Sequence, residues 1–348
     1  MEKKVLILSQ EQPPVVGGAG IIAKQLFDTL TVRGWDVFIN KPHANFPRII
    51  ILFLSFLNVL KSKKYHRVII NDLFYKKIFC LLIKLYKPKN TLIYLHGSEP
   101  EFLLNSPFYK GRFIILCLES KKIIAVSDYM KEKFLTNLLA HPNYSEIEKK
   151  IVVIKNGVDT KLFHNGVDTK LFHNKEIPPK NFINIATCCR LEWGKGFEDM
   201  TSVVLKLLDK NINCHWYIAG EGKDSKSIKA YITEKNIIDN VTFLGVLTPI
   251  EVAGLFNICH FMLLLSNFKE SLGLAYMEAS CCGCYSIGRN SYGVKEAIIN
   301  GETGALVNSV DDAFNVILTD KPEPQSIALS AIKAFSYNAM YQRLEHLF

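Results

Sequence analysis

Short hydrophobic runs recur along the chain, and each is followed by a segment with the apolar spacing of a helix. In the first half these runs predict strands, with helices such as the one from about Ile21 to Arg33 between them. The predicted strands are Val5–Leu8, Val37–Ile39, Val68–Asn71, Thr91–Leu95, Ile123–Val126 and Ile151–Ile154. This alternation is typical of a parallel sheet covered by helices.

The second half repeats the alternation, with helices predicted over Phe197–Lys210 and Lys226–Lys235. Its predicted strands are Asn184–Thr187, His215–Ala219, Val241–Leu244, Phe261–Leu265 and Tyr285–Ile287. We therefore expect an α/β protein with two Rossmann-like, doubly wound domains. Such domains bind ligands at the carboxyl ends of their strands.

A direct duplication lies between the two halves. Asn156–His164 reads NGVDTKLFH, and Asn165–His173 repeats the same nine residues ahead of Pro178 and Pro179. Two copies of nine residues cannot stack into a repeat core, so the segment reads as a linker. A slippage duplication is favoured, because a longer linker costs little loop entropy, and a sequence artefact is the alternative.

The basic charge belongs to the first half. The 348 residues hold 42 Lys and Arg against 33 Asp and Glu, a net charge of +9. Residues 1–155 alone hold 24 basic and 12 acidic residues, and the remainder holds 18 and 21. A basic half implies an anionic partner: nucleic acid, a membrane surface or a phosphorylated substrate. No zinc module, recognition helix or aromatic RNA motif accompanies the charge, so we predict no nucleic acid.

Two segments combine apolar and basic residues. Ile49–Leu60 is followed by Lys61, Lys63 and Lys64, and Lys76–Lys87 has partial helical spacing. Each fits either an anionic bilayer surface or a buried helix with solvated lysines. At 12 residues, Ile49–Leu60 is shorter than a membrane span. The apolar run at the start is too short for a signal-peptide core, and the nine Cys lack regular spacing, so we expect a cytosolic chain with free thiols.

Two candidate sites follow predicted strands in the first half. The Pro13–Gly20 loop contains Gly17 and Gly18 and precedes a helix, so its backbone could approach an anion closely, although a plain turn fits equally. Its spacing differs from the dinucleotide fingerprint. His96 follows Leu95 and could hydrogen-bond a sugar hydroxyl or reacting oxygen, or simply bond its neighbours.

Two cations follow the first predicted strand of the second half. Arg190 and Lys195 lie five residues apart, just ahead of a helix. The planar Arg fork and the Lys point charge suit a diphosphate, while two solvated loop cations are the alternative. The chain contains no Asp-x-Asp sequence, and we predict no divalent metal on the diphosphate.

A Glu-x7-Glu element, Glu270 to Glu278, gives the strongest signal. A helix that begins near Leu272 would present the amides of Ser271, Leu272 and Gly273 to phosphate. Glu270 would reach sugar hydroxyls, and Glu278 would hold a ribose diol. Eight helical residues span about 12 Å, too far for a glycosidase carboxylate pair. Cys281, Cys282 and Cys284 follow, and their tight spacing favours packing over metal binding.

Taken together, these motifs resemble retaining glycosyltransferases of the GT-B fold, in the family 4 (group 1) type. The resemblance covers almost the whole chain and rests on the order and spacing of the motifs. Besides those above, they are Gly34–Val37, Ala125–Ser127, Asn156–Asp159 with Phe163, Ala219–Gly222, Val241–Gly245, Gly293–Glu296, Gly301–Gly304 and Phe335–Tyr337. Leu272 stands where relatives usually carry Phe.

The resemblance implies an acceptor-side domain over 1–165, with tail 335–348 packing back on it, and a donor-binding domain over 166–334. Arg190 and Lys195 would stabilise the departing diphosphate without a metal or other cofactor. Glu278 would hold the ribose, and Glu270 with the Ser271–Gly273 amides the sugar and phosphates. The implied set also contains Gly220 and Leu274 on the donor side, and Gly17, Gly18 and His96 facing the reacting centre.

The implied reaction moves a hexosyl-type residue from a UDP- or GDP-linked sugar to a glycan or lipid-linked acceptor. We expect a role in bacterial surface polysaccharide synthesis, in the cytoplasm or at the cytoplasmic face of the inner membrane. Two alternatives stay open. A GT-B-type nucleotide-sugar epimerase would need no acceptor, and a non-catalytic binder would hold the donor without turnover.

Overall fold

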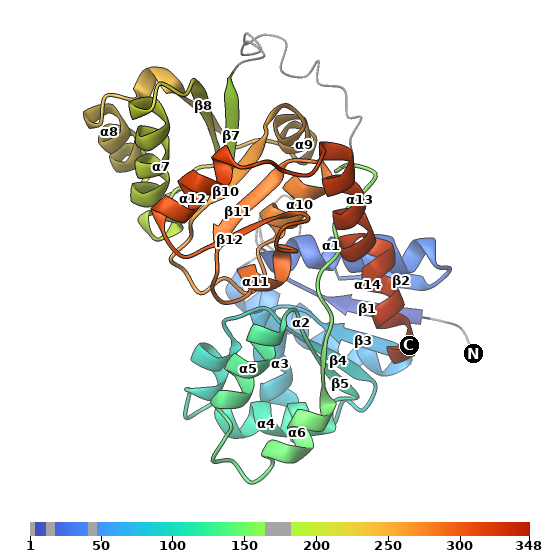
Figure 1. Cartoon of the computed structure of the whole chain (residues 1–348). Helices are drawn as coiled ribbons and strands as arrows, with labels where there is room; N and C mark the ends of the chain where they lie inside the picture. Colours follow the sequence, from blue (N-terminus) through green and yellow to red (C-terminus); the bar gives the residue numbers. More distant parts are fainter. Residues whose placement is uncertain (1–3, 12–17, 41–46, 164–181) are drawn as a thin grey trace. The chain divides into compact units, whose positions relative to one another are not determined.

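The computed structural model describes residues 4–11, 18–40, 47–163 and 182–348. The chain divides into two compact units, Met1–Gly157 with Tyr337–Phe348, and Val158–Ser336 (Figure 1). Each unit contains a six-stranded sheet whose strand pairs are all parallel, which confirms the α/β, doubly wound fold. The predicted domain boundary between residues 165 and 166 lies outside the described residues.

The sheet of the first unit has the order β2-β1-β3-β4-β5-β6. Its strands are β1 (Lys4–Leu8), β2 (Asp36–Ile39), β3 (Arg67–Ile70), β4 (Thr91–Leu95), β5 (Lys122–Ala125) and β6 (Ile151–Val153). Its α-helices are α1 (Gly18–Val32), α2 (Arg48–Lys61), α3 (Leu73–Leu82), α4 (Lys110–Glu119), α5 (Asp128–Thr136), α6 (Tyr144–Lys150) and α14 (Tyr337–Leu344). All predicted strands of this half are confirmed, although three end one residue earlier than predicted: β3 ends at Ile70, β5 at Ala125 and β6 at Val153. Asn71 therefore lies in the loop after β3.

The sheet of the second unit has the order β12-β11-β10-β7-β8-β9. Its strands are β7 (Ile183–Cys188), β8 (Cys214–Ala219), β9 (Val241–Gly245), β10 (Phe261–Leu264), β11 (Tyr285–Arg289) and β12 (Gly304–Val307). Its α-helices are α7 (Phe197–Asp209), α8 (Ser225–Glu234), α9 (Pro249–Ile258), α10 (Leu274–Cys281), α11 (Val294–Ala297), α12 (Val310–Leu318) and α13 (Pro324–Phe335). The hydrophobic pattern missed β12, a four-residue edge strand that begins with glycine.

The strands are continuous hydrophobic runs because helices cover both faces of each sheet and bury their side chains. All five residues of β4 are buried, for example. In the second unit α7 packs with α12, while α10 packs with α9 and α13 (Figure 1). The buried Trp216 of β8 donates its ring N–H to Thr187 Oγ1 at 2.9 Å, so the polar group of this large core side chain is bonded.

The first copy of the duplicated sequence lies beside the chain that returns to the first unit. Val158 N donates to the Phe335 carbonyl at 2.7 Å. A Cβ on Gly157 would lie 2.8 Å from the ring of Tyr337, so this position favours glycine. The copy at 165–173 lies outside the described residues. Beyond the crossing, Arg67 donates to the carbonyls of Leu347 and Phe348 at 3.0 Å each, and thereby ties the carboxyl-terminal tail to the first sheet.

The two basic, apolar segments have different surroundings. The helix α3 overlaps the first part of Lys76–Lys87 and contributes to the core, and Lys76 itself is fully buried, which favours the buried-helix alternative for this part of the segment. The side chain of Lys76 is accommodated because it pairs with a buried carboxylate. By contrast, Ile49 and Phe53 of α2 are 75% and 61% exposed. None of the helices in the described part of the chain is long and apolar enough to cross a bilayer.

Candidate functional site

The strand order of the second sheet places a candidate site where the connections that follow two neighbouring strands diverge. From β7 the chain proceeds outward to β8 and β9, whereas β10, β11 and β12 lie on the other side. The point between β7 and β10 is therefore the topological switch point. Loops that leave the carboxyl ends of two such strands run in opposite directions and open a crevice for ligands.

Lys195 and Glu270 meet at this switch point. Lys195 closes a 3-10 turn after β7, Glu270 lies in the loop after β10, and Lys195 Nζ lies 2.6 Å from Glu270 Oε1. Their side chains are only 11% and 18% exposed. Ser266 Oγ also donates to Glu270 Oε1 at 2.7 Å, and Lys195 Nζ lies 5.5 Å from the ring centre of Phe268. The ammonium group, with three donor hydrogens, keeps capacity for an anionic ligand.

Glycines let the loops at this edge approach one another. Gly196 has φ +84°, and a Cβ there would lie 2.0 Å from the Leu265 carbonyl oxygen. Gly220, after β8, has φ +124°, and a Cβ there would lie 1.9 Å from the Cys189 carbonyl oxygen. Any other residue at either position would be strained by the left-handed backbone conformation, and its Cβ would clash with a carbonyl oxygen. Gly220, a residue of the predicted donor site, thus allows the loops after β7 and β8 to pack closely.

The helix after Glu270 begins later than the sequence predicted. Gly273 caps α10 with φ +100°, and the helix begins at Leu274 rather than near Leu272. The amides of Ser271 and Leu272 therefore belong to the loop, and the Leu272 side chain is buried in the core. A helix start near Leu272 is the expectation from the sequence, but Gly273 has a left-handed backbone conformation, which ends the loop and delays the first helical turn.

Glu278 is the fifth residue of α10 and is half-buried. Burial raises the pKa of its carboxyl from 4.5 to about 7. A carboxyl with such a pKa titrates near neutral pH, a property that is enriched at functional sites. Ionised, it would accept two hydrogen bonds from neighbouring hydroxyl groups.

Arg190 does not join the Lys195–Glu270 pair in this structure. Its side chain is exposed and its Nη1 lies 3.0 Å from Glu192 Oε1. A second cation that the sequence analysis missed lies at the end of β11: Arg289 pairs with Asp199 and donates from Nε to the Leu265 carbonyl at 3.2 Å. The sequence position of Arg289 could have identified it, because it ends a strand of the same parallel sheet.

The first unit has its own switch point, between β1 and β3. Gly17 lies outside the described residues, and Gly18 is the exposed first residue of α1. His96 follows β4, and its Nε2 lies 3.0 Å from Oδ1 of Asn71, the residue after β3. His96, Gly17 and Gly18 thus belong to a different unit from Lys195 and Glu270.

A buried polar cluster surrounds His96 and was not predicted. Glu99 accepts hydrogen bonds from Lys76 Nζ at 2.6 Å and from the backbone N–H groups of His96 and Gly97 at 3.1 and 2.9 Å. Although burial alone would raise it, the charge of Lys76 holds the pKa of Glu99 at about 2. Asp72, directly after Asn71, accepts from the Glu11 amide at 3.1 Å. The Asn71-Asp72 pair after a strand was a usable sequence signal.

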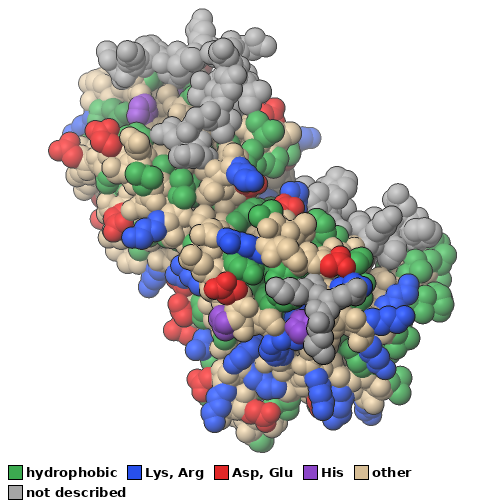
Figure 2. Space-filling model, turned by 90° about the vertical axis from the view of Figure 1, so that its right-hand side faces the viewer, with side chains coloured by type: hydrophobic (Ala, Val, Ile, Leu, Met, Phe, Trp, Pro, Cys, Tyr) green, Lys and Arg blue, Asp and Glu red, His purple; other side chains and the backbone are tan. Residues whose placement is uncertain are grey.

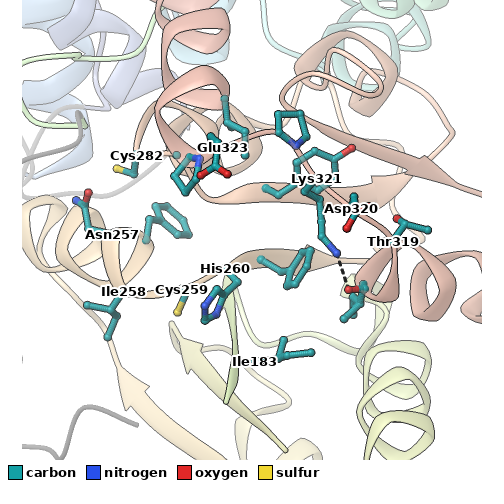
Figure 3. A pocket seen from close by; sticks show the side chains of 18 residues that line it. Ile183, Asn257, Ile258, Cys259, His260, Cys282, Thr319, Asp320, Lys321 and Glu323 are labelled. Carbon is teal, nitrogen blue, oxygen red and sulfur yellow. Dashed lines mark hydrogen bonds between the residues drawn. The ribbon is translucent and has the colours of Figure 1, made fainter. Parts of the chain in front are cut away.

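A pocket of about 590 Å³ lies at the opposite edge of the second sheet (Figure 3). Its lining residues Ile183, His260 and Tyr285 lie at the amino ends of β7, β10 and β11. Lys321 lines it and donates to the Ile317 carbonyl at 2.6 Å. This pocket is therefore separate from the switch-point site, which lies at the carboxyl ends.

Cys281, Cys282 and Cys284 are buried in the core of the second unit, in agreement with the packing interpretation. Burial raises the pKa of the Cys281 thiol to about 12, so the thiol stays protonated at neutral pH. Among the residues that the structure describes, no group of three His, Cys, Asp or Glu side chains is placed to hold a metal ion.

Residues 168–333 match the family model of glycosyl transferases group 1. The chain is 28% identical over 232 residues to an uncharacterized glycosyltransferase of Methanocaldococcus jannaschii, which covers 65% of this chain and 57% of that protein. It is also 28% identical over 214 residues to N-acetyl-alpha-D-glucosaminyl L-malate synthase of Bacillus anthracis, covering 61% and 52%. The chain thus spans somewhat over half the length of these curated relatives.

Solved structures share the fold along the whole chain. The Anabaena HepE protein in complex with UDP and glucose superposes with a TM-score of 0.75 at 18% identity, covering 99% of this chain and 98% of that one. Sucrose-phosphate synthase of Thermosynechococcus elongatus gives 0.75 at 19% identity, with the same coverage. WaaG, a glycosyltransferase involved in lipopolysaccharide biosynthesis, gives 0.67 at 15%, covering 99% and 98%.

Proposed function

We propose that this chain, a glycosyltransferase of group 1 with the GT-B fold, transfers a hexosyl-type residue from a nucleotide diphosphate sugar to a glycan or lipid-linked acceptor. The observation that carries the proposal is the Lys195–Glu270 pair at the switch point of the second unit, inside the family-matched residues. A protected cation beside a carboxylate suits a ligand that joins a diphosphate to a polyhydroxyl sugar.

On the donor side, Lys195 and Arg190 bind and neutralise the diphosphate, which grows more negative as the sugar departs. They need no metal or other cofactor for this role. Glu278 accepts hydrogen bonds from the ribose diol, and Glu270, held by Ser266, faces the sugar hydroxyls. The exposed Arg190 side chain can exchange Glu192 for phosphate at small cost, because exposed ion pairs are weak.

On the acceptor side, His96, with Gly17 and Gly18 of the same unit, binds the acceptor and orients its attacking hydroxyl. The anomeric carbon keeps its configuration, because the attacking hydroxyl approaches from the face that the diphosphate leaves. The C–O bond to the diphosphate breaks, a C–O bond to the acceptor forms, and the hydroxyl proton passes to the departing phosphate. The protein supplies orientation and electrostatic stabilisation to this step.

The donor is a UDP- or GDP-linked sugar, and the product belongs to bacterial surface polysaccharide. Structures of the fold neighbour HepE contain UDP or UDP-glucose, and the neighbour WaaG is described as acting in lipopolysaccharide biosynthesis. Those proteins are under 20% identical to this chain, so they support the class of donor and product rather than one sugar.

The enzyme works in the cytoplasm and docks on the cytoplasmic face of the inner membrane through α2. Ile49, Phe53 and Leu60 lie on one stripe of this helix and are exposed, and exposed Lys61, Lys63 and Lys64 follow. The face shown in Figure 2 has Lys and Arg side chains gathered over the first unit. Apolar insertion beside lysines is the chemistry of an anionic interface, where each lysine adds about 1 kcal/mol.

A donor panel tests the proposed function. UDP- and GDP-sugars are added singly to the protein, and the melting temperature is recorded. A donor at about 100 times its Kd adds about 2.7 kcal/mol of stability. We expect one nucleotide class to raise the melting temperature, and acceptor-dependent release of UDP or GDP with that donor. Absence of any shift across both classes contradicts the proposal, and sugar isomerisation without acceptor replaces it with an epimerase.

A further inference from the structure

A chain of hydrogen bonds joins three loops of the first unit. Asn71 Nδ2, after β3, donates to the Ala19 carbonyl in the first turn of α1 at 2.7 Å and to Ser9 Oγ, after β1, at 3.0 Å. Asn71 Oδ1 lies 3.0 Å from His96 Nε2, after β4. A carbonyl oxygen can only accept, so the contact with Ala19 fixes which end of the Asn71 amide is the nitrogen.

The orientation of this amide decides the tautomer of His96. Because Asn71 Oδ1 has no hydrogen, His96 Nε2 must carry one, and the lone pair of the neutral ring lies on Nδ1. We infer that Asn71 is a positioning residue that holds His96 as the Nε2–H tautomer, so that a sugar or acceptor hydroxyl that meets the ring at Nδ1 donates to it. The role toward a hydroxyl rests on the proposed function, whereas the tautomer rests on the hydrogen bonds alone.

The surroundings keep the ring neutral. Burial lowers the pKa of His96 to about 3, and the charge of Lys76 opposes protonation further, against the opposite effect of Glu99. Lys76 and Glu99 are 0% and 1% exposed, so solvent screens their charges little. A ring that stays neutral across the working pH range keeps the acceptor nitrogen that the tautomer defines.

The same ion pair holds the backbone of the His96 loop. Glu99 accepts from the amides of His96 and Gly97, while Lys76 Nζ donates both to Glu99 and, at 2.8 Å, to the Asn71 carbonyl. Lys133 Nζ, from α5, donates to the Gly97 carbonyl at 2.6 Å. The loops that present Asn71 and His96 are thus joined by a side-chain bond and by a buried cation.

Nitrogen NMR of histidine-labelled protein reads the tautomer directly. The His96 signals are identified by their loss in His96→Gln. We expect one protonated and one unprotonated ring nitrogen, with the proton on Nε2, unchanged between pH 5 and pH 8. A proton on Nδ1 or a doubly protonated ring in this range overturns the inference.

Two variants of Asn71 separate positioning from folding. Asn71→Leu removes the acceptor, so His96 should show a mixture of tautomers. Asn71→Asp keeps an acceptor at the same place and adds a negative charge, so it should keep Nε2–H and raise the His96 pKa by more than one unit. Asn90→Leu is the matched control, because Asn90 Nδ2 donates to the Tyr65 carbonyl at 2.7 Å outside this chain of bonds. Unchanged Nε2–H in folded Asn71→Leu contradicts the inference.

The outcomes distinguish this inference from the proposed function. An Nε2–H ring in a protein that binds no sugar nucleotide leaves the positioning by Asn71 intact and removes its proposed ligand. Turnover of a donor by a protein whose His96 carries its proton on Nδ1 contradicts the positioning by Asn71 and leaves the proposed function intact. If Asn71→Leu does not fold, the wild-type spectrum and the Asn71→Asp titration still decide the tautomer.

Discussion

Lys195 Nζ and Glu270 Oε1 lie 2.6 Å apart across the switch point of the second sheet. The two residues are 75 positions apart in sequence, and they meet because β7 and β10, which precede them, are neighbours in the sheet. The pair fixes the direction of a largely buried ammonium group before any ligand arrives. Preorganisation of this kind lowers the cost of ordering the group on binding.

Donor binding should depend on pH through Glu278. The ionised carboxylate accepts the two hydroxyls of a diol with its two oxygens, whereas protonation places a hydrogen on one of them. Burial raises the pKa of Glu278 to about 7 in the free protein. Below this pH we expect the Kd of the sugar nucleotide to rise by up to about tenfold per unit, because binding must first remove a proton. The measurement is a titration with the panel's best sugar nucleotide, whose diphosphate diester does not titrate in this range.

Glu278→Gln should flatten that pH profile, because an amide does not titrate. The exposed Glu234, at the end of α8, supplies the control Glu234→Gln, which should keep the wild-type profile. Glu278 also affects folding: its raised pKa favours the fold at low pH, and this contribution is lost as pH rises from about 4.5 toward 7. An unchanged profile in Glu278→Gln would show that another group titrates.

Gly196→Ala should lower the unfolding free energy of the second unit more than Gly301→Ala, a substitution that only strains the backbone. Gly301 has the same φ of +84° but nothing within 4 Å of an added Cβ, whereas a Cβ on Gly196 would lie 2.0 Å from the Leu265 carbonyl oxygen. We expect Gly301→Ala to cost about 1–2 kcal/mol of unfolding free energy and Gly196→Ala clearly more. Denaturant unfolding measures both, and equal costs would contradict the close approach.

Deletion of Asn165–His173 should leave donor binding and folding intact. The first copy, through Val158 and Gly157, already supplies the contacts with the returning chain at Phe335 and Tyr337. Linker shortening changes the loop-closure entropy little. Circular dichroism and the donor-induced rise in melting temperature check the deletion. Loss of the folded state would show that the second copy is structural.

Membrane docking should depend on the exposed stripe of α2. Ile49→Ser combined with Phe53→Ser should abolish flotation with anionic vesicles at low salt, and leave the melting temperature nearly unchanged, because both side chains are exposed. The control is Leu329→Ser, since Leu329 of α13 in the second unit is also exposed. No flotation of the wild-type protein, or undiminished flotation of the double variant, removes the docking proposal.

Sequence periodicity predicted the fold well because buried parallel strands are continuous hydrophobic runs. The predicted Thr91–Leu95 strand, for example, has the bounds of β4. The short edge strand β12 escaped, since four residues that begin with glycine carry little pattern. Periodicity left the surroundings of α3 open, because it cannot reveal that Lys76 has a buried partner in Glu99.

The sequence singles out individual residues of the candidate site, but it does not show which side chains are in contact. The positions after strands singled out Lys195, Glu270 and His96, because the carboxyl ends of parallel strands share one edge. Their partners Asn71, Glu99 and Ser266 depend on which strands are neighbours, and this order is a tertiary property. The start of α10 differs from the prediction because the sequence alone does not show that Gly273 has a left-handed backbone conformation.

The affinity of Lys195→Ala for the panel's best sugar nucleotide tests the switch-point site most directly. Lys206→Ala is the control, because Lys206 forms an exposed ion pair with Asp311 at 2.7 Å in the same unit. Loss of a charged hydrogen bond to the diphosphate should weaken binding by at least about tenfold in Lys195→Ala, with wild-type affinity in the control. Equal affinity in the folded Lys195→Ala protein would contradict a donor site at the Lys195–Glu270 pair.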